Sequence, residues 1–237
     1  METQQIIQSL SYVTWVLLGG LAFGSFALTW WLKQTTDATA GFLGFSAILA
    51  AVFGLGWLMV EWGLPAPVDL EIGQLPELNE PRRAAIAAFT LLSFVAGIRL
   101  RRGGRALWLG ALAILAGLAA LFLGAVSWGE AEPISVSIFV QLVALSAVTG
   151  GSLAAVVLAH WYLVTPKISE RPLIVTTQLL MLALIIKLLL FGVWTAAGIP
   201  DFEPFEILSG DNLFFVWLRL IVGLVAPLVL TLSLIHI

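Results

Sequence analysis

The sequence predicts an all-α integral membrane protein, a polytopic helical bundle with seven spans present and an eighth lost by truncation. Three observations predict this fold class. Hydrophobic residues occupy 60% of the 237 positions and charged residues only 11%, whereas soluble domains average roughly 45–50% and 25%. Seven apolar stretches match or approach the roughly 20 residues that a helix needs to cross a bilayer. Lys and Arg are concentrated in alternate connections between those stretches.

The predicted spans are separated by connections that carry most of the charged residues, the longest of them residues 63–83. The third span is shorter than a bilayer requires, so the side chains of Arg82 and Arg99 at its ends are expected to snorkel to the headgroups. Residues 1–8 contain no Lys or Arg, unlike a cleaved signal peptide, and the first span is therefore expected to be retained. The spans run approximately over residues 10–32, 41–62, 84–98, 106–128, 135–164, 173–197 and 213–231.

The distribution of cations predicts the orientation, because short cytoplasmic loops collect Lys and Arg. Only Arg82 and Arg83 are expected in loops on the opposite side, which holds most of the acidic residues. We therefore expect a bacterial cytoplasmic (inner) membrane protein with an external N-terminus and a cytoplasmic Arg99–Arg105 loop. The predicted cytoplasmic cations are Lys33, Arg99, Arg101, Arg102, Arg105, Lys167 and Arg171.

An internal repeat accompanies the spans. A shift of 131 residues places Gly19-Gly20 on Gly150-Gly151 and Trp30 on Trp161. The match predicts two parallel four-helix repeats related by an axis along the membrane normal, an arrangement whose binding sites commonly lie between the halves. Chance similarity between apolar helices is the alternative. The predicted repeats are residues 1–130 and 131–231.

The last six residues, 232–237, have the sequence LSLIHI. This string matches a translation of CTG TCT CTT ATA CAC ATC, identified as a transposase sequencing adapter. The chain is then expected to be cut inside its last helix, and the missing eighth span would be the counterpart of the fourth. The alternative is a natural apolar helix end.

Two cations lie well inside predicted spans. Lys187 and Arg219 fall roughly 10–12 Å below the outer boundary at 1.5 Å per residue, at similar depth on consecutive helices. A central cation costs about 2.5–3.5 kcal/mol on insertion scales, so each requires a partner or a route to water. We predict an anion-attracting ligand site here, with Glu61 as the carboxylate that could pair with either cation. Snorkelling, and an interfacial position for Glu61, are the alternatives.

His160 lies near the inner end of the fifth predicted span. It could be a haem ligand or a proton relay, since ionisable groups in spans are commonly functional. The competing interpretation is an interfacial histidine, which the lack of a second histidine inside a span favours.

Several classes of chemistry are excluded or disfavoured. The chain has no Cys, which removes disulfides, Fe–S clusters and thiolate zinc sites, and its net charge of −3 offers no electrostatic basis for binding nucleic acid. No nucleotide-binding glycine loop or nucleophile elbow occurs. The Asp69/Glu71 and Asp201/Glu203 loops could hold a divalent cation, but solvated loop acids are the commoner case and no metal is predicted.

These patterns predict a non-enzymatic polytopic inner-membrane protein. It is expected to bind an apolar or anionic ligand, a lipid or a quinone, between its halves, and it could serve as an accessory subunit of a membrane complex. Its predicted partners are the lipid bilayer and other membrane subunits. Two alternatives remain open: a small secondary transporter for an anionic solute, and a haem-bearing electron-transfer subunit, which a Soret band in the purified protein would distinguish.

Overall fold

The computed structural model describes residues 3–65, 75–129, 134–165, 169–197 and 213–235. All regular elements within these ranges are helical. The chain divides into two compact units, Met1–Leu173 and Ile174–Ile237. The first unit contains α1 (Thr3–Thr35), α2 (Ala40–Trp62), the short 3-10 helix η1 (Pro76–Leu78), α3 (Asn79–Arg101), α4 (Leu107–Gly129) and α5 (Ile134–Val164).

The second unit is formed by the chain from α6 (Arg171–Ala197) onward, although the first turn of α6 falls in the first unit. The remaining helical segments are α7 (Leu213–Leu220), a π-helical turn (Ile221–Val225) and α8 (Ala226–Ile235). Pro227 is the second residue after the π turn. Because proline has no backbone N–H and its ring crowds the preceding turn, a local widening of the helix is expected there.

Six of the helices are long and apolar enough to cross a membrane. They correspond to the first six predicted spans. The seventh predicted span contains only a shorter apolar helix, Val216–Leu232, so seven spans remain a prediction.

The third span differs from the sequence-based expectation. The helix α3 extends over 23 residues, so it includes Arg82 and Arg83 in its first turns and Arg99 in its last turn. The prediction of a short span with Arg82 and Arg83 in a loop was therefore wrong. Arg82 is also only 1% exposed, so it does not snorkel. The physical reason is that arginine itself favours helix, while the carboxylate of Glu61 neutralises Arg82 and so allows its burial.

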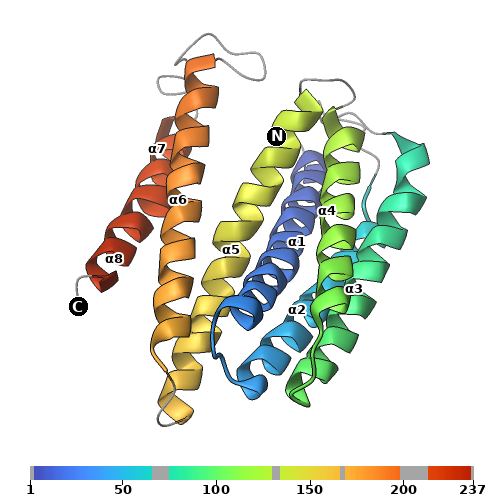
Figure 1. Cartoon of the computed structure of the whole chain (residues 1–237). Coiled ribbons are helices and arrows are strands. Elements are labelled where there is room, and N and C mark those ends of the chain that lie inside the picture. Colours follow the sequence, from blue (N-terminus) through green and yellow to red (C-terminus); the bar gives the residue numbers. More distant parts are fainter. Residues whose placement is uncertain (1–2, 66–74, 130–133, 166–168, 198–212, 236–237) are drawn as a thin grey trace. The chain divides into compact units, whose positions relative to one another are not determined.

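The first unit is built around α1. This helix packs against α2, α4 and α5, while α3 packs against α2 and α4 (Figure 1). The N-terminal ends of α1, α3 and α5 and the C-terminal ends of α2 and α4 therefore lie at one end of the unit, which we call the N-terminal end. Chain segments far apart in the sequence meet there.

The contact between α1 and α5 depends on glycine. A Cβ atom built on Gly24 would overlap the carbonyl oxygen of Ser146, and one built on Gly150 would overlap the backbone of Ser25. Small residues let two helix backbones approach closely in this way.

The division into units does not follow the predicted repeats. The helix α5, which the repeat assigns to the second half, packs against α1 and α4 within the first unit. The parallel repeat remains a prediction.

Candidate functional site

A buried ion pair joins α2 and α3 at the N-terminal end of the first unit. Glu61 occupies the last turn of α2, and Arg82 occupies the first turns of α3. These two helices pack against each other and run in opposite directions, which brings the end of one beside the beginning of the other. The two side chains are each 1% exposed.

The carboxylate of Glu61 receives hydrogen bonds on both oxygens. Arg82 Nε donates to Oε1 at 3.0 Å and to Oε2 at 2.9 Å, and Arg82 Nη2 lies 2.8 Å from Oε1. The indole Nε1 of Trp15 on α1 donates to Oε2 at 2.6 Å. Asn79 Oδ1 accepts a further bond from Arg82 Nη2 at 3.0 Å. Three helices are thereby linked through one carboxylate.

This geometry accounts for the presence of two charges in the interior. Desolvating an ion costs several kcal/mol, and only close pairing with further hydrogen bonds offsets that cost. Charge-assisted bonds of this kind are roughly twice as strong as neutral ones. The pair is formally neutral, so its electrostatic role is to position groups rather than to attract a net charge.

A group of packed aromatic rings adjoins the pair through Trp15. Trp15, which is fully buried, lies edge-on between Trp57 at 5.0 Å and Trp128 at 4.7 Å between ring centroids. Tyr12 packs against Trp128 at 5.6 Å, and its hydroxyl donates to the carbonyl oxygen of Pro65 at 3.0 Å. We call Glu61, Arg82, Trp15, Trp57 and Trp128 the Glu61–Arg82 centre.

Three N–H groups of this centre are buried without an acceptor among the described residues. They belong to Arg82 Nη1, Trp57 Nε1 and Trp128 Nε1. Each lies on a side chain that contacts either Glu61 or Trp15. Leaving a buried donor unsatisfied costs about 1–3 kcal/mol, so three on side chains linked through Glu61 and Trp15 are unusual. The centre has a surplus of donors and suits a ligand that brings acceptors.

Comparison with known proteins gives no family. No family model, no curated protein and no solved structure matches the chain. Any functional conclusion therefore rests on the residues themselves.

The predicted site residues fall in different parts of the structure. Glu61 is paired with Arg82, a partner that the sequence analysis did not consider. Lys187 lies on α6 in the second unit; it is 5% exposed and takes part in an interaction. Arg219 lies in α7, and its side chain is outside the described residues. A site shared by Lys187, Arg219 and Glu61 remains a prediction.

The other predicted positions carry less information. His160 is exposed near the C-terminal end of α5. The Asp69/Glu71 and Asp201/Glu203 loops lie outside the described residues. Among the residues that the structure describes, no group of three potential metal ligands from His, Asp and Glu occurs.

Sequence reasoning missed Arg82, Trp15, Trp57 and Trp128 as members of a site. One signal was available: Glu61 ends one apolar stretch and Arg82 begins the next, and consecutive antiparallel helices place those ends at the same level. The tryptophans gave no comparable signal. Trp57 and Trp15 lie on apolar helices in which any face could be buried.

Proposed function

We propose that the protein is a polytopic membrane protein that binds an apolar ligand carrying hydrogen-bond acceptors, such as a quinone or the ester carbonyls of a lipid, at the Glu61–Arg82 centre. The observation that carries this proposal is the cluster of three buried N–H donors without acceptors in the described structure. The six long apolar helices support a bilayer as the surrounding medium.

The chemistry of the centre favours a neutral acceptor. Glu61 already compensates the charge of Arg82, so a ligand need not be anionic. The rings of Trp15, Trp57 and Trp128 offer apolar contact, while the indole and guanidinium N–H groups select a carbonyl oxygen. A site of this kind combines a mostly apolar lining with a few fixed polar groups, as ligand sites usually do.

Access to the donors requires movement. The three donor atoms are closed to solvent, so the helix ends at the N-terminal end must part to admit a carbonyl oxygen. Binding would then favour the opened arrangement, and affinity would depend on how often it is populated.

Replacing Trp57 by phenylalanine is expected to weaken quinone binding. The substitution keeps a six-membered aromatic ring and removes the pyrrole portion of the indole, with its N–H donor and its share of the packing. The loss of one hydrogen bond, about 0.5–1.5 kcal/mol, corresponds to roughly 2–10-fold in Kd. Isothermal titration of the detergent-solubilised protein with decylubiquinone, and separately with a short-chain diacylglycerol, measures the change and distinguishes the two ligand sources.

Trp62→Phe is the matched control, because Trp62 is 67% exposed at the same end of α2. Its affinity should equal that of the unchanged protein. Equal affinity in Trp57→Phe would instead mean that the donors of the centre do not bind ligand. If Lys187→Met alone abolishes binding, the ligand belongs at the Lys187 and Arg219 level.

The proposed orientation places the Arg99–Arg105 loop in the bacterial cytoplasm. Because the chain has no native Cys, single cysteines report position directly. Glu80→Cys and Arg102→Cys lie at opposite ends of α3. In intact cells an impermeant maleimide should label the first and spare the second. The reverse pattern would invert the topology.

A further inference from the structure

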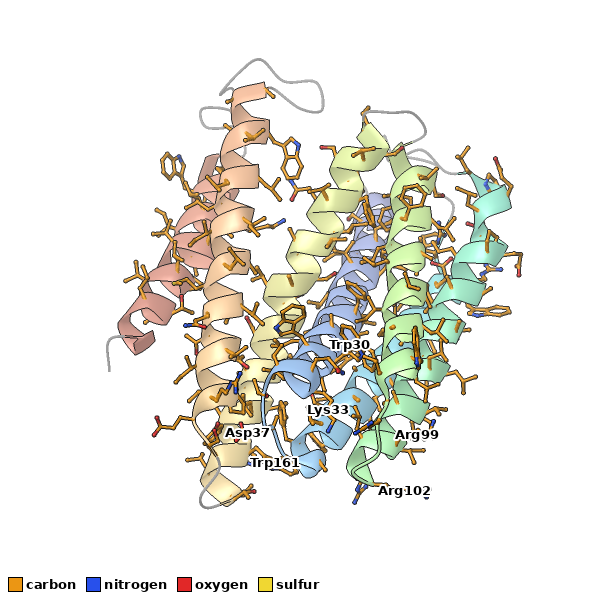
Figure 2. All side chains as sticks on the ribbon, viewed as in Figure 1. Trp30, Lys33, Asp37, Arg99, Arg102 and Trp161 are labelled. Atoms are coloured by element: carbon orange, nitrogen blue, oxygen red, sulfur yellow. The ribbon has the colours of Figure 1, made fainter. Side chains whose placement is uncertain are left out.

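Five cations gather at the end of the first unit opposite the Glu61–Arg82 centre. Figure 2 shows Lys33, Arg99 and Arg102 at this end, near Trp30. Arg101 and Arg105 flank the same turn between α3 and α4. The four arginines are exposed and Lys33 is half-buried. We call Lys33, Arg99, Arg101, Arg102 and Arg105 the cationic end.

These cations have no carboxylate partner within the described residues. The ion pairs found there, Glu61–Arg82 and Arg83–Glu80, both lie at the opposite end of α3. Asp37 is exposed and forms neither of them. Although the whole chain has a net charge of −3, the five cations outnumber Asp37, which Figure 2 labels at the same end, so this end has a net positive charge.

The backbone holds the arginines in a defined turn. The N–H of Arg102 donates to Ile98 O at 3.3 Å, that of Gly103 to Leu100 O at 2.9 Å, and that of Gly104 to Arg99 O at 2.9 Å. Gly103 has a φ of +73°, a conformation that glycine adopts without strain. The turn is therefore short and hydrogen-bonded, and the backbone positions of Arg99, Arg101 and Arg102 are fixed relative to one another.

Aromatic side chains border the cationic end. Trp108, at the beginning of α4, is 79% exposed, and Trp31 on α1 is 47% exposed. Trp30 Nε1 donates to Leu107 O at 3.3 Å, which ties α1 to the start of α4. Exposed tryptophans beside cations at helix ends are typical of the level where hydrocarbon meets headgroups.

We infer that the cationic end binds the phosphate groups of anionic phospholipids. The inference rests on the proposed membrane location but not on the ligand of the Glu61–Arg82 centre. Guanidinium groups recognise phosphate oxygens with paired hydrogen bonds, and the adjacent tryptophans and apolar helix surfaces suit the acyl chains. A cluster of basic residues directly beside membrane-spanning helices is a known pattern for binding anionic lipids.

Native mass spectrometry of the full chain, released from detergent with palmitoyl-oleoyl phosphatidylglycerol or phosphatidylcholine, tests the inference. The unchanged protein should retain phosphatidylglycerol in preference. The variant R99Q/R101Q/R102Q/R105Q should bind it more than about tenfold less, since each cation near an anionic surface contributes about 1 kcal/mol. The double variant R102Q/R105Q should be intermediate, which keeps the test informative if the quadruple variant fails to fold.

R83Q is the control, because it removes a cation at the opposite end of α3. It should retain the full preference for phosphatidylglycerol. Equal retention of both lipids by the unchanged protein, or unchanged preference in both arginine-to-glutamine combinations, would overturn the inference. Free glycerophosphoglycerol that displaces the lipid would show that the site recognises soluble phosphate esters instead. The proposed membrane location is tested separately by detergent phase separation. Protein that stays in the aqueous phase would contradict that location.

Discussion

Replacing Arg82 by methionine is expected to lower the free energy of unfolding by about 3–5 kcal/mol, because it leaves the Glu61 carboxylate buried without its cation. Both side chains are 1% exposed, so water cannot screen the stranded charge. Trp15 Nε1 would be the remaining described donor to the carboxylate. Reversible unfolding in mixed micelles with increasing dodecyl sulfate measures the change.

The double variant Glu61→Met/Arg82→Met separates the loss of the pair from the stranding of one charge. Replacing a buried pair by apolar residues of similar volume is often neutral or stabilising. The double variant should therefore be much closer to the unchanged protein than Arg82→Met is. If both variants lose the same stability, the ion pair is not what makes Arg82 important. In that case the hydrogen bond from Arg82 to Asn79 would be the next contact to test as the source of the lost stability.

Adding a single methyl group at Gly24 is expected to disrupt the contact between α1 and α5. The Cβ of Gly24→Ala would overlap the Ser146 carbonyl oxygen, which belongs to the helix backbone and cannot rotate away. The two helices would have to separate, at a cost of about 1–3 kcal/mol or more for overpacking. Gly150→Ala should have a similar effect, because it faces the α1 backbone from the other side. The same micelle unfolding experiment applies.

Gly56→Ala provides the matched control for these glycine variants. It lies within α2, and a Cβ there would meet only the Leu18 side chain, at 3.5 Å. Alanine favours helix over glycine by about 0.8–1.0 kcal/mol in solvent-exposed helices, so Gly56→Ala should be neutral or slightly stabilising. A loss of stability in Gly56→Ala equal to that of Gly24→Ala would show that the effect is general to helix glycines. The close contact between α1 and α5 would then not be the cause of the lost stability.

Much of the secondary structure was predictable because one physical requirement dominates it. An apolar chain in hydrocarbon must satisfy its backbone hydrogen bonds internally, so long apolar stretches become helices. The six long helices accordingly match the predicted spans. The helix α3 is the exception. Its predicted limits stopped at Arg82 and Arg99 because a hydropathy scale penalises every charged residue, including one that is paired in the folded protein.

The amino-acid sequence by itself therefore determined the helical class, the approximate limits of the long helices and the cluster of cations around Arg99 and Arg102. Only the tertiary structure decided that Glu61 pairs with Arg82, that Trp15 donates a hydrogen bond to Glu61, and that Trp57 and Trp128 pack against Trp15. The physical reason is that hydropathy depends on composition along one helix, whereas a buried polar contact depends on the rotation and level of several helices, which packing between them sets.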